Sequence, residues 1–341
     1  MGEKFRVGVS PEVVTADGGT VFGEDAMKIL DDPAIEWEYL PERVPALTQE
    51  HAARYDAFCL MTAKVTRETL SGRHRRLKLV ARFGVGYDSV DVPACTEAGV
   101  MLTITPEGVR RPVASSVMAY VLALAHRMLL KDQLVRENRW AEKGNFLGMG
   151  LTGRTLGVIG VGNIGSEVFR LAQPFDMRLL GCDPNVPQSE VDSLGVTMTD
   201  MDTLMRESDF VSVNTLLDDT TRGLIGAREF GLMKPTAYFI NTSRGPVVQE
   251  AALTETLENN LIAGAAIDVF AQEPVAMDNP LLKLDNVILA PHAICHTDEC
   301  MQLLGKLAFQ AAADLAHGRK AEHLVNPEVL DHPAWSGKWS Q

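Results

Sequence analysis

Short apolar runs alternate with helix-like stretches along most of the chain, a pattern typical of parallel β-sheets covered by helices. The first third holds enough such runs for a small α/β domain. A second series of about six runs has the size of a complete dinucleotide-binding domain. The expected strands are residues 5–9, 58–61, 79–82 and 101–103 in the first series, and 156–159, 178–182, 210–213, 237–241, 265–269 and 287–290 in the second.

A long apolar helix is expected between the two series, over residues 112–131. Apolar side chains recur there at three- and four-residue steps. The helix is expected to begin at Pro112, because proline is favourable in the first turn. The helical pattern resumes after Pro291 and runs to about Leu315, and the tail over residues 323–341 is rich in loops.

The composition is that of a globular protein of roughly two domains. The formal net charge of -13 argues against binding to a polyanion such as nucleic acid. It does not exclude a small anionic substrate, since one arginine can dominate its immediate surroundings. The sequence contains no run approaching about 18 apolar residues, so we expect no membrane span.

Five cysteines are scattered without a CxxC pair or regular spacing. An odd and sparse set is typical of reduced thiols and not of a disulfide framework. The first residues lack the apolar core of a signal peptide. We therefore expect a cytoplasmic protein, and no resident metal.

The most specific local signal is the sequence Gly160-Val161-Gly162-Asn163-Ile164-Gly165. It follows an expected strand and opens a helix, which is the context that makes a GxGxxG motif a pyrophosphate-binding turn. Asp183 stands 18 residues after Gly165, at the end of the next expected strand. A carboxylate there can accept hydrogen bonds from the adenosine ribose but repels a 2′-phosphate. Residues 184–186 supply no arginine, so we expect NAD as the cofactor and not NADP.

Three later strands each end in a residue with catalytic potential: Arg244, Glu273 and His292. Taken singly, they suggest a surface arginine, a solvated acid and a structural histidine. Taken together, they are the parts that a hydroxy-acid dehydrogenase needs. The arginine binds a carboxylate or carbonyl oxygen, the histidine moves the proton, and the glutamate orients the imidazole and favours its charged form.

Further short motifs occur in a fixed order along nearly the whole chain. They are VARFGVGYD at residues 80–88, GVGNIG at 160–165, NTSRG at 241–245, DVF at 268–270 with Glu273-Pro274, Pro291-His292 and Asn326-Pro327. With these motifs the chain resembles the D-isomer-specific 2-hydroxyacid dehydrogenase family, which includes phosphoglycerate dehydrogenase and glyoxylate/hydroxypyruvate reductase. The resemblance implies NAD-dependent hydride transfer at C2 of a small 2-hydroxy or 2-oxo acid, such as glyoxylate or hydroxypyruvate.

The resemblance also assigns roles to individual residues. Arg244, Glu273 and His292 take the catalytic positions, and Arg244 and His292 also contact the substrate. The backbone of Val85 and Gly86 would hold the substrate carboxylate. The implied cofactor contacts are Gly160, Gly162, Asn163, Ile164, Gly165, Asp183, Thr215, Thr242 and Asp268.

The family topology implies a chain that crosses twice between two α/β domains, Rossmann-like or flavodoxin-like, with parallel sheets and an active-site cleft between them. Residues 1–104 and 295–341 would form the substrate domain, and residues 105–294 the NAD-binding Rossmann domain. Family members dimerise through the cofactor domain. The apolar helix over residues 112–131 offers surface for a homodimer.

The chain departs from the family pattern at several positions. It has Asn214-Thr215-Leu216-Leu217-Asp218 in place of His-x-Pro-Leu-Thr, and Ser115 in place of an acidic residue. After His292 it continues Ala293-Ile294-Cys295-His296, so His296 is an alternative acid. Arg110 and Arg111 could meet a second acidic group on the substrate, or form a solvated hinge.

Two other functions stay open from the sequence alone. Transcriptional corepressors share this fold and retain the arginine, glutamate and histidine, but they carry appended tails that this chain lacks. Phosphite dehydrogenases also keep all three residues. Formate dehydrogenases pair the histidine with glutamine, and Glu273 argues against that activity.

Overall fold

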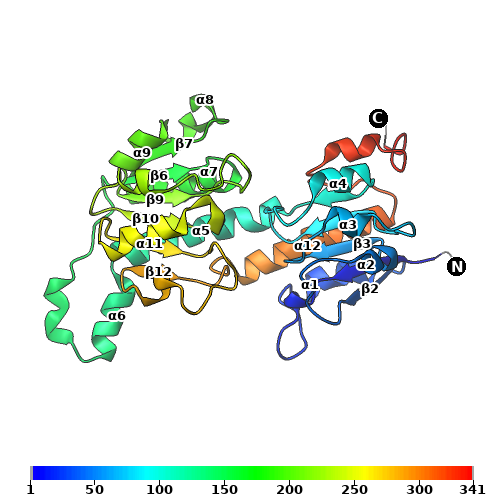
Figure 1. Cartoon of the computed structure of the whole chain (residues 1–341), viewed down its shortest axis with the longest axis horizontal. Coiled ribbons are helices and arrows are strands. Elements are labelled where there is room, and N and C mark those ends of the chain that lie inside the picture. Colours follow the sequence, from blue (N-terminus) through cyan, green and yellow to red (C-terminus); the bar gives the residue numbers. More distant parts are fainter. Residues whose placement is uncertain (1–2, 340–341) are drawn as a thin grey trace. The chain divides into compact units, whose positions relative to one another are not determined.

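The computed structural model describes residues 3–339 and divides the chain into two compact units. One unit comprises Met1–Val109 and His296–Gln341, and the other is Arg110–Cys295. The outermost residues expected in the substrate domain, 1–2 and 340–341, lie outside the described part. Each unit is built on its own parallel sheet, which confirms the expected fold class of two α/β domains (Figure 1).

The first unit holds a five-stranded parallel sheet in the order β2-β1-β3-β4-β5, the flavodoxin-like order. Its core includes the fully buried strands β3 and β4. The strands are β1 (Phe5–Val9), β2 (Ile35–Tyr39), β3 (Ala57–Leu60), β4 (Leu79–Arg82) and β5 (Met101–Thr103). The helices are α1 (Glu24–Met27), α2 (Gln49–Arg54), α3 (Arg67–Leu70), α4 (Val92–Glu97) and α12 (Asp298–Ala316), with short 3₁₀ turns at Pro11–Val13, Lys28–Asp31 and Pro327–Asp331.

The second unit holds a seven-stranded parallel sheet in the order β12-β11-β10-β9-β6-β7-β8. The strand order reverses between β6 and β9, and ligands of such sheets bind at the carboxyl ends of the strands on either side of that point. The strands are β6 (Thr155–Ile159), β7 (Arg178–Cys182), β8 (Val196–Met198), β9 (Phe210–Val213), β10 (Tyr238–Asn241), β11 (Gly264–Ile267) and β12 (Val287–Leu289). The helices are α7 (Asn163–Ala172), α8 (Gln188–Val191), α9 (Met201–Glu207), α10 (Ala227–Phe230) and α11 (Glu250–Glu258), with 3₁₀ turns at Gln173–Phe175, Asp192–Leu194, Gly245–Val247 and Pro280–Lys283.

Both faces of the second sheet are buried, because successive side chains of a strand point to opposite faces. Val158 of β6 packs into the core on the face that α5 and α7 cover, and its neighbour Ile159 packs into the core on the opposite face. The strands therefore read as continuous apolar runs. That is why the sequence revealed the five strands of this sheet that are fully or largely buried, which are β6, β7, β9, β10 and β11.

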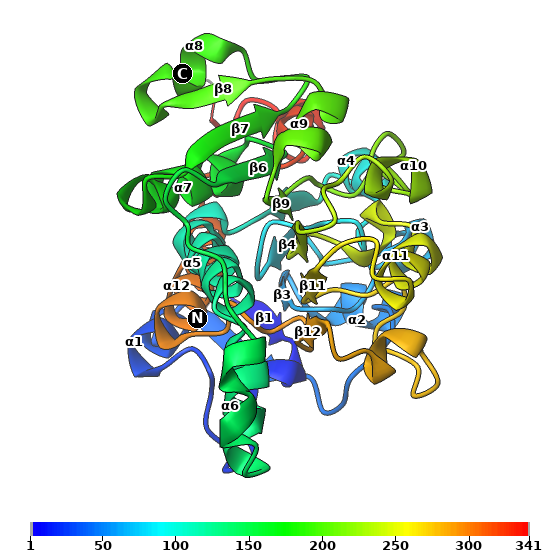
Figure 2. The ribbon, with the colours of Figure 1, turned by 90° about the vertical axis from the view of Figure 1, so that its left-hand side faces the viewer.

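The long helix between the two series is longer at its start and ends sooner than expected. α5 spans Pro106–Ala125, and Pro112 lies inside it instead of beginning it. Arg127 adopts a left-handed conformation with φ 50°, and a second helix, α6 (Met128–Arg136), starts at the next residue (Figure 2). The expected single helix over 112–131 was wrong because one residue in the left-handed conformation, Arg127, ends α5, and the spacing of apolar residues carries no sign of it. A short 3₁₀ segment, η3 (Trp140–Asn145), follows α6.

Among the described residues, no single helix is long and apolar enough to cross a membrane. α5 and α6 pass that criterion only as a pair, and the two are bent by 55°.

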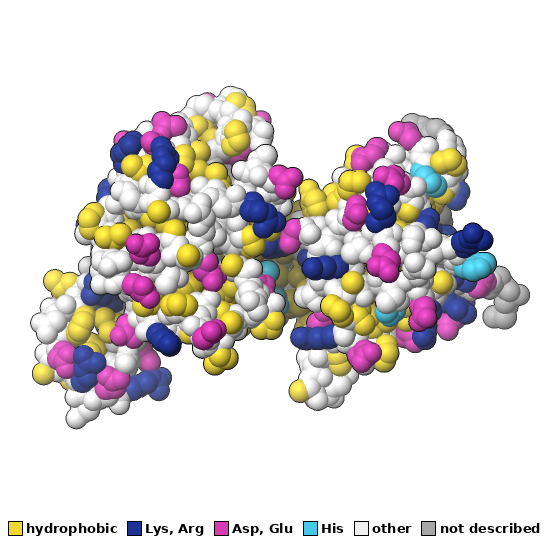
Figure 3. All heavy atoms as spheres, viewed as in Figure 1, with side chains coloured by type: hydrophobic (Ala, Val, Ile, Leu, Met, Phe, Trp, Pro, Cys, Tyr) yellow, Lys and Arg dark blue, Asp and Glu magenta, His cyan; other side chains and the backbone are white. Residues whose placement is uncertain are grey.

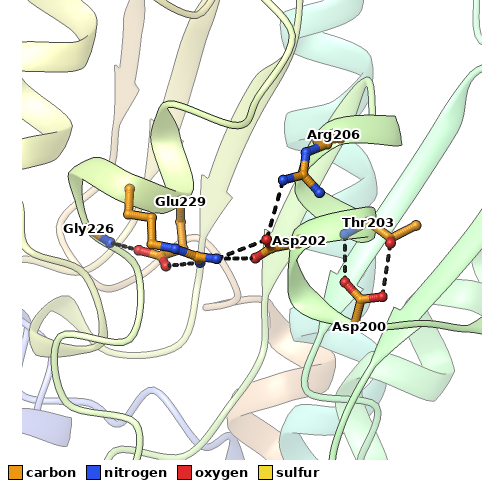
Figure 4. A network of polar contacts seen from close by, with 7 residues as sticks. Asp200, Asp202, Thr203, Arg206, Gly226 and Glu229 are labelled. Atoms are coloured by element: carbon orange, nitrogen blue, oxygen red, sulfur yellow. Dashed lines mark hydrogen bonds and ion pairs between the residues drawn. The ribbon is translucent and has the colours of Figure 1, made fainter.

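A polar network on the surface of the second unit fixes α9 and α10 (Figure 4). Asp200 caps α9 by accepting hydrogen bonds from the amide and the hydroxyl of Thr203, both at 2.9 Å. Asp202 of α9 accepts two hydrogen bonds from Arg228 of α10, at 2.7 and 2.8 Å. Because α9 leads directly into β9, the network helps to hold the strand whose end carries Thr215.

Candidate active site

The glycine-rich turn joins β6 to α7 at the point where the strand order reverses. Gly160 has φ +86°, and a Cβ added there would lie 2.8 Å from backbone atoms of Asn214 and Thr215. Gly165 lets the helix approach the turn, since its added Cβ would lie 2.1 Å from the carbonyl oxygen of Gly160. Gly162 caps α7 and faces open space. The turn therefore leaves the first amides of a ten-residue helix accessible to a phosphate.

Asp183, at the end of β7, holds this turn in place. One carboxylate oxygen accepts the amide of Val161 at 2.9 Å, and the other accepts the amide of Asn185 at 2.8 Å. Each carboxylate oxygen has a second acceptor site, so ribose hydroxyls can still bind. The sequence predicted the contact to ribose but not the role in shaping the turn.

Three buried oxygen atoms lie at the carboxyl ends of β9 and β10 without a hydrogen-bond partner among the described residues. They belong to the side chains of Asn214, Thr215 and Thr242. Unpaired buried polar atoms are rare in folded proteins because each one costs free energy. A dinucleotide carries ribose hydroxyls and phosphate oxygens that can pair with such groups. The two threonines fit the cofactor contacts expected of them.

The loop after β10 presents Arg244 at the same edge of the sheet. Asn241 is buried, and its side-chain oxygen accepts the amide and the hydroxyl of Ser243 at 3.0 and 2.8 Å. Its side-chain nitrogen donates to the carbonyl of Arg244 at 3.1 Å. A Cβ on Gly245 would lie 1.9 Å from the carbonyl oxygen of Phe270, so the loop packs directly on the segment after β11. The half-buried Arg244 thus sits on a rigid support.

The expected pairing of Glu273 with His292 is present. Nδ1 of His292 lies 2.7 Å from one carboxylate oxygen of Glu273, and the other oxygen accepts the amide of Phe270 at 3.0 Å. The two side chains are 43% and 37% exposed. This contact orients the imidazole and leaves Nε2 as the nitrogen for proton transfer.

Asp268 fixes the backbone of His292 and of the two residues that follow it. Its carbonyl accepts the amide of His292 at 2.8 Å. Its carboxylate accepts the amides of Ala293 and Ile294 at 2.9 and 3.2 Å. His292 has φ 54°, a left-handed conformation that a non-glycine residue adopts at a cost, and these bonds hold it there. The sequence assigned Asp268 to the cofactor and did not reveal this second role.

The ionisation of Glu273 follows from its neighbours. Burial opposes the charged form, but the hydrogen bond and the charge of His292 outweigh it and lower the pKa of Glu273 below its ordinary value. The amide of Phe270 and the charge of Arg244 act in the same direction. Glu273 is therefore a carboxylate at neutral pH.

We expect Glu273→Gln to move the alkaline limb of the rate of 2-oxo acid reduction to lower pH. Reduction needs a protonated imidazole, and the variant removes the negative charge that stabilises it. The measurement is kcat as a function of pH in the reducing direction. The matched control is Glu250→Gln, whose carboxylate accepts the amide of Ala271 and the side chain of Asn279. An unchanged limb in Glu273→Gln would show that the pairing does not set the protonation state.

The remaining predicted substrate contacts, Val85 and Gly86, lie in the first unit, in the loop after β4. Buried Arg82 holds this loop by donating from Nε to the carbonyl of Gly86 at 2.9 Å. The amides of Val85 and Gly86 donate to no backbone carbonyl among residues 3–339. His296, the alternative acid, begins the C-terminal segment of the first unit. That the two units contribute to one site stays a prediction.

Arg110 and Arg111 both lie close to a carboxylate of their own chain, that of Glu167. Arg111 donates to buried Glu167 of α7 at 2.7 Å, and Nε of Arg110 lies 4.0 Å from the same carboxylate. Arg170 also donates to it. Burial opposes ionisation of Glu167, but Arg111 and Arg170 lower its pKa. This cluster ties the first turns of α5 in the second unit to the helix that follows the glycine-rich turn.

The surface chemistry is mixed. On the face shown in Figure 3, acidic and basic side chains are interspersed and no continuous basic field is visible. Within the described part of the chain, no three His, Cys, Asp or Glu side chains are arranged to hold a metal ion.

Comparison with known proteins identifies the second unit. The family model described as D-isomer specific 2-hydroxyacid dehydrogenase, NAD binding domain, matches residues 118–293. A glyoxylate reductase of Korarchaeum cryptofilum is 39% identical over 258 residues, which cover 75% of this chain and 78% of that protein. A D-3-phosphoglycerate dehydrogenase of Synechocystis is 37% identical over 332 residues, which cover 96% of this chain. The chain spans only 59% of the length of that enzyme.

Among solved structures, D-lactate dehydrogenase from Aquifex aeolicus, complexed with NAD and lactic acid, has a TM-score of 0.82 and 26% sequence identity. The match covers 94% of this chain and 99% of that chain. The likeness to that structure therefore extends over residues of both units.

Proposed function

The chain belongs to the D-isomer specific 2-hydroxyacid dehydrogenase family, and we propose that it reduces a small 2-oxo acid to the D-2-hydroxy acid. It is an NAD-dependent oxidoreductase. The observation that carries the proposal is the contact of 2.7 Å between His292 and Glu273, together with Arg244 on the adjoining loop.

The substrate carboxylate would be held by the amides of Val85 and Gly86 and by Arg244. The two amides donate to no backbone carbonyl among the described residues, and consecutive backbone amides are well suited to bind an anion. The guanidinium of Arg244 presents several donors in a fixed plane, which matches a carboxylate and an adjacent carbonyl oxygen. These contacts match the carboxylate and the adjacent carbonyl group of a 2-oxo acid.

NAD, when reduced and bound, supplies the hydride for C2. Arg244 stabilises the negative charge that develops on the carbonyl oxygen. His292, held by Glu273 through Nδ1, donates a proton from Nε2 to that oxygen. The carboxylate of Glu273 favours imidazolium before the step and keeps the ring oriented after it. In the oxidising direction the same imidazole accepts the proton.

The substrate class is tested by following the absorbance of NADH in two assays. One measures oxidation of NADH by a panel of 2-oxo acids, and the other measures reduction of NAD by phosphite. The panel is glyoxylate, hydroxypyruvate, longer 2-oxo acids and a 2-oxo diacid. We expect turnover with at least one small 2-oxo acid. Oxidation of phosphite without reduction of any 2-oxo acid would contradict the proposal.

The adenosine end of the site favours NAD over NADP, because Asp183 occupies the ribose position and exposed Asn185 follows it without a cation. We expect the double change Asp183→Ser with Asn185→Arg to raise the ratio of kcat/KM for NADPH to that for NADH on the order of tenfold. Since Asp183 also accepts the amide of Val161, the affinity for both cofactors should fall. A wild-type preference for NADPH would contradict this assignment.

We further propose a cytoplasmic homodimer that uses the segment after α5. The apolar side of α5 is buried in the core of its own unit, so it cannot form the dimer surface expected from the sequence. Exposed apolar side chains follow it on α6, η3 and the loop beyond. They are Met128, Leu129, Val135, Trp140 and Leu147, each more than half exposed. A second copy of the chain would cover them.

A further inference from the structure

Tyr120 is a buried side chain on the face of α5 that packs against the second sheet. It is 3% exposed and lies in the same core cluster as Ala266 of β11, with Ala290 and Ile294 packed against that cluster. Ser116, one helical turn earlier on the same face, donates from its hydroxyl to the carbonyl of Ile294 at 3.1 Å. α5 is therefore anchored directly beneath the segment that carries His292.

The hydroxyl of Tyr120 is buried and has no hydrogen-bond partner among residues 3–339. An apolar core usually excludes such a group, because a buried hydroxyl without a partner costs free energy that phenylalanine would not. The unpaired oxygens of Asn214, Thr215 and Thr242 are the other unpaired buried side-chain atoms described in this unit. Those three lie where a cofactor would pair with them, which suggests the same explanation for the phenol.

Asp268 connects Tyr120 to that site. Burial, and secondarily the negative charge of Asp268, raise the pKa of Tyr120. Asp268 also binds the amide of Ile294, the residue that Ser116 anchors. A neutral phenol is a hydrogen-bond donor, and a carboxylate is its natural acceptor.

We propose that Tyr120 is a positioning residue for the nicotinamide end of the cofactor, and that its hydroxyl acquires a partner through Asp268 when NAD binds. Asp268 has to hold its two backbone amides and the nicotinamide at once. A hydrogen bond from the hydroxyl of Tyr120 would fix the carboxylate of Asp268 in the orientation that binds the two amides and the nicotinamide. The inference rests on the proposed cofactor contact of Asp268.

Tyr120→Phe tests the inference by removing one oxygen and little else. Without cofactor, we expect a melting temperature equal to or above that of the wild type, since an unpaired buried hydroxyl is removed. The Kd for NADH, measured by fluorescence or calorimetry, should rise on the order of tenfold, as for a lost hydrogen bond to a charged group. The Kd for ADP-ribose, which lacks nicotinamide, should not change.

Tyr238→Phe is the matched control, because Tyr238 is 7% exposed and lies at the opposite, amino end of β10. It should alter neither Kd. An unchanged Kd for NADH in Tyr120→Phe would overturn the inference, as would equal losses for NADH and ADP-ribose, or a lower melting temperature without cofactor. Asp268→Asn tests the proposed cofactor contact of Asp268 separately from the role of Tyr120. If it also leaves NADH binding intact, the proposed cofactor contact of Asp268 fails as well.

Discussion

Replacing His292 by alanine should lower kcat for 2-oxo acid reduction on the order of 100-fold or more, the usual size of lost general acid catalysis. The imidazole is the group that Glu273 orients at 2.7 Å and that the backbone bonds of Asp268 hold in a strained conformation. Alanine removes the proton donor but keeps the backbone amide that Asp268 binds. The loss should appear in kcat, measured with the best substrate at saturating NADH.

His296→Ala is the control for this experiment, because His296 is the nearby alternative acid in the sequence. It should retain turnover close to that of the wild type. If His292→Ala kept its turnover and His296→Ala lost it, the assignment of the acid would be wrong. An unchanged Kd for NADH in His292→Ala would show that its defect is chemical and not structural.

Replacing Arg244 by alanine should lower kcat/KM on the order of 100- to 1,000-fold, through both a lower kcat and a higher KM. The guanidinium is expected to bind the carboxylate in the ground state and to stabilise charge on the carbonyl oxygen in the transition state. Arg244→Lys should recover only part of the loss, because an ammonium group cannot make the planar two-point contact. The measurement is the steady-state kinetics of all three proteins with one 2-oxo acid.

Arg222→Ala, at an exposed position after β9, is the control for a lost positive charge in the same unit. It should leave kcat/KM unchanged. A rise in KM alone for Arg244→Ala would mean that the arginine only binds the substrate. The charge on the carbonyl oxygen would then be stabilised by another group.

The apolar runs were sufficient to predict the buried strands and the edge strands β5 and β12, but not the edge strands β2 and β8. β2 alternates between buried or partly exposed residues and exposed Glu36 and Glu38, because successive side chains point to opposite faces and one face meets water here. β8 is only three residues long and forms one edge of the seven-stranded sheet, next to β7. Neither forms the continuous apolar run that marks a strand buried on both faces. The sequence therefore predicted four and six strands where the sheets have five and seven.

At the site, the sequence predicted the pairing of Glu273 with His292, and it missed the contacts that support Arg244 and His292. The pairing of Glu273 with His292 could be expected because each residue type has a chemical role at a strand end. The side chain of Asn241 behind Arg244, and the two backbone bonds of Asp268, depend on loop conformations that spacing does not specify. Arg111 with Glu167 joins residues 56 positions apart, a contact that only the folded chain reveals.

The most direct test of the central claim is the fate of the hydride. NADH carrying deuterium at both C4 positions would be supplied with the 2-oxo acid that is reduced fastest, glyoxylate excepted because glycolate has no D or L form. The product would be analysed by NMR and chiral chromatography. Hydride transfer to C2 predicts one deuterium at C2 of a hydroxy acid of D configuration. A product without deuterium at C2, or with L configuration, would contradict the account.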